Sequence, residues 1–199
     1  EFKKEKSKLF LSITLIIVSL SIYLNYKHFI SYRFQSYLIG EWTRSQLKIP
    51  LEPIKDFDET IPNLSATGIP LSAMKGRYFL RDGKSQVALD YFNKAEKENY
   101  TIGVPDNLKS QLFFQQKNLD SAYIYAKRAF EKLPNNTIHA SVYFDILSLL
   151  GDKDELYKAF EKITLKERYV EFYNSFYEAL LRIETTPNQE IYKEIKKIL

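Results

Sequence analysis

A long uncharged stretch lies near the beginning of the chain. Its core reads LFLSITLIIVSLSIYL, from Leu9 to Leu24, and the uncharged run continues to Tyr26, eighteen residues in all. As an α-helix rising about 1.5 Å per residue, this run would span about 27 Å, close to the thickness of a bilayer's hydrocarbon core. Its four Ser and Thr hydroxyls can hydrogen-bond to helix carbonyls and do not prevent insertion. The pattern therefore predicts a transmembrane helix over residues 9–26.

A basic flank precedes the apolar run, and no typical cleavage site follows it. The flank contains four lysines: Lys3, Lys4, Lys6 and Lys8. We expect residues 1–26 to form a basic flank and a membrane helix, in a bacterial inner membrane. Because positive flanks favour the cytoplasmic side, the rest of the chain is then expected in the periplasm. A cleaved signal would show small residues after the run, but Asn25, Tyr26, Lys27 and His28 stand there. The sequence therefore favours an uncleaved membrane anchor over a cleaved signal sequence.

Aromatic and basic residues are mixed over the juxtamembrane segment, residues 27–49, which we expect to continue the helix. Its aromatic residues are Phe29, Tyr32, Phe34, Tyr37 and Trp42. They suit the headgroup zone at the exit of a membrane helix and equally suit a cap beneath the following domain. Four prolines and a glycine then interrupt helical periodicity: Pro50, Pro53, Pro62, Gly68 and Pro70. This composition predicts an extended proline-rich linker over residues 50–68.

Beyond residue 68 the hydrophobic pattern is helical and repeats with a 34-residue period. The repeating positions are Gly83, Lys117 and Gly151; Ala88, Ala122 and Leu156; Phe92, Ala126 and Phe160; and Ala95, Ala129 and Ile163. Each position of the first set lies between two amphipathic patterns, which predicts two antiparallel helices per unit. We expect three units over 69–102, 103–136 and 137–170, and a degenerate fourth repeat with capping helices over 171–199.

The residue types at these positions resemble those of tetratricopeptide repeats. The first unit carries Gly76, Phe79, Gly83, Ala88, Phe92 and Ala95. The second keeps Phe113, Ala122, Ala129 and Pro134 but has Ser110 and Ala126, and the third keeps Leu147, Gly151 and Phe160. The resemblance implies an all-α fold, a right-handed superhelix of antiparallel helix pairs, here preceded by a transmembrane helix. In the second turn, Lys117-Asn118 must replace glycine, and Asn118 tolerates a left-handed backbone better.

The basic charge belongs to the N-terminal segment. The chain carries +4 at pH 7, but residues 1–50 hold eight Lys or Arg against three Glu, a charge of +5 that leaves −1 for the remainder. A nearly neutral body lacks the concentrated positive field that binding to phosphate backbones requires. We therefore expect no nucleic-acid partner.

Catalytic and metal-binding patterns do not emerge from the sequence. The chain has no cysteine, and its two histidines, His28 and His139, stand in separate segments without a local carboxylate to orient them. The carboxylates fit solvated faces or helix caps, and no phosphate-binding loop, dinucleotide fingerprint or zinc-protease motif occurs. We expect no enzyme activity, no cofactor and no metal in these residues.

The resemblance also implies a partner-binding surface, because the first helices of tetratricopeptide units line a concave groove that holds a protein or peptide. By repeat position, the groove residues would be Arg77, Arg81, Asn107, Gln111, Phe114, Gln115, Ser141 and Asp145. Amides, hydroxyls and a few charges suit hydrogen bonding to an extended chain. The lysine and asparagine set that clamps a C-terminal carboxylate in chaperone-binding members is not reproduced.

Two functions follow from this organisation. The first is a membrane-anchored scaffold that mediates protein–protein interaction at the outer face of a bacterial inner membrane. The second function depends on where the given sequence starts. The chain begins at Glu1 and its single methionine is Met74, so we expect it to be a processed chain or a piece of a longer one. In that case the organisation is similar to the C-terminal tail of polytopic O-antigen ligase or polymerase-like proteins, with the active site upstream of Glu1.

Overall fold

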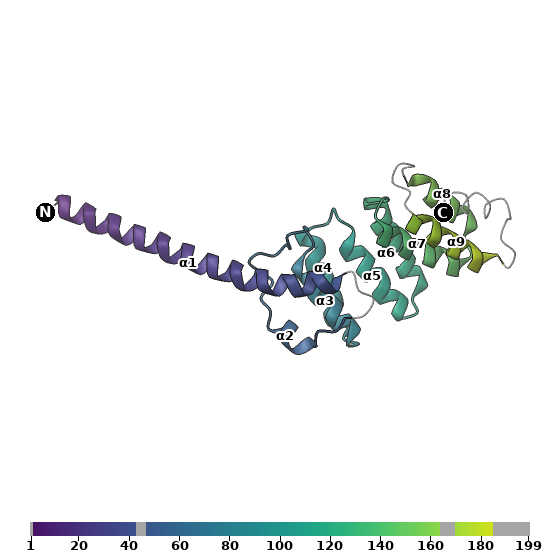
Figure 1. Cartoon of the computed structure of the whole chain (residues 1–199), viewed down its shortest axis with the longest axis horizontal. Coiled ribbons are helices and arrows are strands. Elements are labelled where there is room, and N and C mark those ends of the chain that lie inside the picture. The colour runs from purple at the N-terminus through teal and green to yellow at the C-terminus, as the bar shows by residue number, and fades with distance from the viewer. Residues whose placement is uncertain (1, 43–46, 164–169, 185–199) are drawn as a thin grey trace.

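The computed structural model describes residues 2–42, 47–163 and 170–184, which form one long helix followed by a stack of shorter ones (Figure 1). These ranges contain α-helices and no strand beyond an isolated bridge between Leu64 and Pro70. The helices are α1 (Phe2–Trp42), α2 (Leu51–Lys55), α3 (Leu71–Arg81), α4 (Ser85–Glu98), α5 (Val104–Gln115), α6 (Leu119–Lys132), α7 (Thr137–Leu150), α8 (Lys153–Lys162) and α9 (Val170–Ile183). The all-helical prediction is confirmed over the described residues.

Helix α1 continues without a break from the apolar run into the body. Its 41 residues would reach about 60 Å at 1.5 Å per residue, and Figure 1 shows it leaving the body as a single rod. The large apolar side chains of the run are exposed, and the helix is long and apolar enough to cross a membrane. The hydroxyls of Ser12 and Thr14 donate to the carbonyls of Lys8 and Phe10, which leaves these side chains satisfied without water.

The C-terminal part of α1 has two different faces. Along one face Ser31, Gln35, Leu38 and Glu41 are buried against the body, as a cap requires. The opposite face carries exposed aromatic side chains: Phe29, Tyr32 and Tyr37. Of the juxtamembrane aromatic residues, Phe34 and Trp42 pack against the body as the cap interpretation expects, and the headgroup interpretation stays a prediction for the three exposed ones.

The proline-rich segment expected as an extended linker packs against the body. It contains the short helix α2, whose Leu51 and Ile54 are buried, and Phe57 follows as a further buried side chain. Glu59 is buried as well, and its carboxylate pairs with Lys75 of α3 at 3.0 Å and with Lys94 of α4 at 2.9 Å. Pro50 still precedes the first helical residue, where a proline costs no hydrogen bond.

The remaining helices form antiparallel pairs with a constant spacing. Helices α4, α6 and α8 begin at Ser85, Leu119 and Lys153, one repeat length apart, and each packs against the helix before it. The turn residues Gly83, Lys117 and Gly151 have φ values of 73°, 60° and 70°. The left-handed residue of the second turn is thus Lys117, which corrects the expectation that favoured Asn118.

Small residues let the paired helices approach closely. A Cβ atom on Gly76 would lie 2.7 Å from the Phe92 ring, so no larger residue fits there without a shift. At the equivalent position of the second pair, the buried Ser110 hydroxyl donates to the Ala122 carbonyl at 2.9 Å across the two helices. The alanines that define the repeat in α4 and α6 are all buried: Ala88, Ala95, Ala122, Ala126 and Ala129.

The repeat extends to buried polar groups. Lys75 lies over the Tyr91 ring and Lys109 over the Tyr125 ring, each at 5.3 Å, and the two lysines stand one repeat length apart. Both lysines are nearly fully buried, and each pairs with a carboxylate, Lys109 with Glu96. Burial of these charges is compensated by the ion pair and the aromatic face together.

The helices form two layers. Each of α3, α5 and α7 contacts the next first helix along the stack, and α7 also packs broadly against α9. The backbones of the second helices α4, α6 and α8 do not approach one another as closely within the described residues, and ion pairs bridge these helices instead: Glu96 with Arg128 and Lys127 with Glu155. The first helices therefore form one continuous layer, which we call the inner layer, with α9 as its fourth member. The capping helix expected after Thr186 lies outside the described residues.

Candidate partner-binding groove

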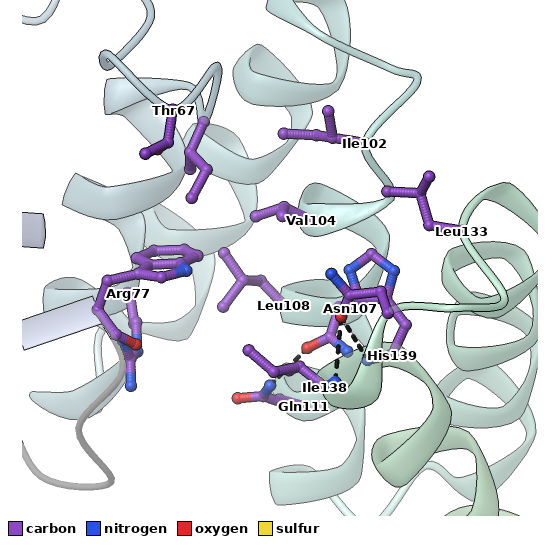
Figure 2. A pocket seen from close by; sticks show the side chains of 13 residues that line it. Thr67, Arg77, Ile102, Val104, Asn107, Leu108, Gln111, Leu133, Ile138 and His139 are labelled. Carbon is purple, nitrogen blue, oxygen red and sulfur yellow. Dashed lines mark hydrogen bonds between the residues drawn. The ribbon is translucent and has the colours of Figure 1, made fainter. Parts of the chain in front are cut away.

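Two neighbouring hollows lie on the inner layer, and together they form what we call the inner groove. The first hollow, of about 290 Å³, lies between the end of α1 and helices α3, α5 and α7 (Figure 2), and the second, of about 350 Å³, lies between α5, α7 and α9. Gln111 lines both hollows. The inner groove thus runs across consecutive first helices, which is the surface the repeat resemblance implies.

Arg77 closes one end of the first hollow. Its guanidinium donates to the Trp42 carbonyl at 2.7 Å and lies 5.2 Å from the centroid of the Trp42 ring, so it holds the last residue of α1. Burial lowers the pKa of Arg77, and this effect outweighs the Glu41 carboxylate nearby, which acts to raise the pKa. Arg81 likewise donates to the Ile49 carbonyl at 2.6 Å and pairs with Asp82. Both arginines, expected to face a partner, instead bind the chain's own segments around the end of α1.

An amide pair on α5 lines the floor of the first hollow. The Gln111 side chain donates to the Asn107 side-chain oxygen at 2.6 Å, and Figure 2 shows the two side chains one turn apart on the same face. Asn107 is buried, and its Nδ2 has no hydrogen-bond partner among the described residues. Gln111 is half-buried and remains within reach of a molecule in the groove. The pair therefore presents carboxamide groups, which can both donate to and accept from a peptide backbone.

His139 belongs to the wall of the first hollow. It is 2% exposed, and burial lowers its pKa to about 4, so the imidazole is neutral at neutral pH. The ring packs tightly on Gly103, where a Cβ atom would lie 2.8 Å from the ring carbon Cε1. Asn136 accepts from the amides of Ile138 and His139 and so begins α7 at this point. This geometry fits a structural role for His139.

The second hollow is mainly apolar. Phe114 of α5 is 47% exposed and Leu149 of α7 is 53% exposed, although both are large apolar side chains, and Val142 and Ile146 also line this hollow. At the rim the Asp145 carboxylate pairs with Arg182 of α9 at 2.5 Å. A concave apolar surface with a polar rim is the usual anatomy of a protein-binding site.

The predicted residues divide into three groups in the structure. Asn107, Gln111, Phe114 and Asp145 line the inner groove. Arg77 lines the first hollow and Arg81 lies nearby, but both are engaged with the end of α1. Gln115 is exposed and Ser141 half-buried, and neither lines either of the two hollows of the inner groove.

Arg182 and Trp42 line the groove but were not among the predicted residues. Arg182 stands two repeat lengths after Phe114, so extending the repeat register into the fourth unit would have found it. Trp42 lies outside the repeat register altogether, and its place depends on how α1 packs.

The described part of the chain holds no candidate metal site. In residues 2–42, 47–163 and 170–184, no group of three or more His, Asp or Glu side chains could hold a metal ion. Comparison of the chain with protein-family models, with curated proteins and with solved structures gave no match. The function is therefore argued from the geometry of the groove and the anchor.

Proposed function

We propose that the chain is a membrane-anchored, tetratricopeptide-like scaffold that binds a protein partner in its inner groove. Residues 9–26 of α1 would span the membrane, and the basic flank before them would stay cytoplasmic. This places the helical body at the outer face, which is the periplasmic face of an inner membrane if the source is bacterial.

The observation that carries this proposal is the pair of neighbouring hollows on consecutive inner helices, which share Gln111 in their linings. Exposed apolar side chains such as Phe114 and Leu149 are costly in water unless they serve a contact, and here they lie together in a concavity rather than singly. The Asn107–Gln111 amide pair next to them supplies hydrogen bonds in fixed positions. Apolar anchors beside oriented amides suit a polypeptide better than a small charged metabolite.

The groove favours binding over catalysis. Its charged groups are already engaged: Arg77 with the Trp42 carbonyl, and Asp145 with Arg182. The one imidazole among the described groove residues, that of His139, is buried with a lowered pKa, which makes it a poor general base. We therefore propose no reaction for the residues described.

The proposal is tested by recovering partners from solubilised membranes with the tagged full chain and three variants. Gln111→Ala and Phe114→Ala alter the inner groove, whereas Ile124→Ala removes an equally exposed apolar side chain from α6 in the outer layer. We expect one or more proteins to be recovered with the wild type and with Ile124→Ala and to be lost with the two groove variants. The purified partner should then bind with the same ranking. Equal binding to all four proteins would contradict the proposal.

A further inference from the structure

A third hollow lies between α1 and the segment that follows α2. It measures about 200 Å³, and its lining includes Lys27 and Ile30 of α1 and Asp58 and Ile61 of the facing segment. This volume is below the ~300 Å³ at which pockets for drug-sized ligands begin, so a group of few heavy atoms suits it.

The hollow lies at the level where the uncharged run of α1 ends. Lys27 directly follows Tyr26, the last residue of that run, and both line the hollow. At 1.5 Å per residue, Lys27 is within about 2 Å of the end of the proposed membrane span. If residues 9–26 span the membrane, the hollow opens in the headgroup layer.

Two contacts hold the facing segment beside α1 at this level. Phe57 stacks on Phe34 with centroids 4.5 Å apart and planes 9° from parallel, and the Asp58 carboxylate forms an ion pair with Lys27. The Asp58 carboxylate is itself oriented by Thr60, whose backbone amide and hydroxyl both donate to it. These contacts preorganise the segment rather than leave it a loose loop.

The lining carries one positive and one negative group, and both are accessible. The Lys27 side chain is 22% exposed and the Asp58 side chain 46% exposed. An anionic headgroup would be attracted by Lys27 but repelled by the Asp58 carboxylate. A zwitterionic headgroup instead offers an opposite charge to each of these two side chains. An ammonium group that keeps its N–H donors can also hydrogen-bond to Asp58, which a quaternary ammonium cannot.

We propose that this hollow binds the headgroup of a zwitterionic phospholipid with a primary ammonium group. The lipid phosphate pairs with Lys27 and the ammonium with Asp58, while the 37% exposed Ile61 contacts the glycerol end of an acyl chain. The segment around Ile61 is then a second membrane contact of the body, beside the anchor. This inference rests on the proposed span of α1.

The membrane contact is tested with single cysteines, since the chain has none of its own. The full chain in phosphatidylethanolamine-containing nanodiscs carries a nitroxide label at Ile16→Cys in the proposed span, at Ile61→Cys, or at Ile124→Cys in α6. Collision with oxygen and with a water-soluble nickel chelate measures the depth of each label. We expect Ile16 in the hydrocarbon core, Ile61 at headgroup depth and Ile124 in water. Water exposure of Ile61 with a buried Ile16 would overturn this inference alone, whereas water exposure of Ile16 would overturn the span as well.

Headgroup selection is tested by native mass spectrometry of the full chain released from equal mixtures of phosphatidylethanolamine and phosphatidylglycerol. We expect one retained phosphatidylethanolamine in preference to phosphatidylglycerol. Asp58→Asn should reduce its retention about tenfold, the effect of one lost charge-assisted hydrogen bond. Glu52→Gln in α2 removes a more exposed carboxylate nearby and should change nothing. Equal retention of the two lipids, or no difference between these variants with unchanged melting curves, would overturn the proposal.

Discussion

The Tyr78 hydroxyl donates a 2.7 Å hydrogen bond to a carboxylate oxygen of Glu41, and this contact ties the end of α1 to the first helix pair. Glu41 also accepts from the backbone amides of Lys48 and Ile49, so this buried carboxylate joins α1, the segment after it and α3. Burial and the Glu41 carboxylate raise the pKa of Tyr78, which keeps its phenol protonated as a donor. The junction therefore couples the proposed anchor to the body as a fixed connection.

Replacing Tyr78 by Phe should destabilise the body by about 1.5–3 kcal/mol, because a buried carboxylate loses a hydrogen-bond donor. Tyr100→Phe is the matched control, since Tyr100 is 67% exposed. Denaturant unfolding of the full chain in detergent, followed by circular dichroism, measures both. Equal stability of the two variants would show that the Glu41–Tyr78 contact contributes nothing.

Lys117→Gly should stabilise the protein by about 0.5–1 kcal/mol. Lys117 has a φ of 60°, a left-handed conformation that is less favourable for an L-residue than for glycine. Relief of this strain stabilises the folded state, and the larger conformational entropy of glycine in the unfolded chain offsets only part of that gain. Gln116→Gly alters the exposed neighbour, whose φ of −79° gives glycine no advantage, and should lower the melting temperature. A lower melting temperature for Lys117→Gly would contradict the backbone assignment.

Gly103→Ala should cost about 1–3 kcal/mol more than Gly68→Ala. Both glycines have positive φ, so both substitutions strain the backbone, but only at Gly103 would the new methyl group meet other atoms: the His139 ring at 2.8 Å and the Ala129 carbonyl at 2.9 Å. The difference between the two variants thus isolates crowding in the wall of the first hollow. Thermal unfolding of both variants measures this difference. A similar loss of stability in the two variants would mean that the residues around Gly103 shift to accommodate the methyl group.

Acidification should weaken the fold through His139. Its folded pKa of about 4 lies below the ordinary value of 6.5, so the unfolded chain binds an additional proton between these values and stability falls as pH drops from about 6.5 to about 4. The contribution is about 3 kcal/mol at 1.36 kcal/mol per pH unit. Unfolding of the wild type, of His139→Gln and of the exposed-site control His28→Gln across this range measures it. His139→Gln should show a shallower pH dependence than the other two proteins, and parallel curves would contradict the assignment.

The repeat could be predicted from the sequence because its physical causes are local. Turn residues recur once in every repeat and small helix positions recur in the first two, and each acts within its own helix pair, as Gly76 does against Phe92. In the second turn the left-handed residue was expected at Asn118, but Asn118 caps the N-terminus of α6. Its side chain accepts a hydrogen bond from the Ser121 amide. The strained backbone position then falls on the residue before it.

The junction and the third hollow could not be predicted in the same way. Tyr78 and Glu41 are 37 residues apart, and Arg77 and Trp42 are 35 apart, with the proline-rich segment between them. No periodicity connects such positions, since their contact depends on how α1 docks on α3. For the same reason the repeat register assigned Arg77 and Arg81 to a partner, whereas the docked α1 and the segment after it supply the carbonyl groups that they bind.

The most direct test of the proposed scaffold is photo-crosslinking in native membranes from two positions of the full chain. A photoreactive phenylalanine analogue replaces Phe114 in the inner groove or Ile124 on the outer layer, which are similarly exposed. We expect a discrete crosslink to one protein from position 114, its loss when Gln111→Ala is added, and no such product from position 124. The same product from both positions, or none from position 114 while the partner is still recovered, would contradict the inner groove as the binding site.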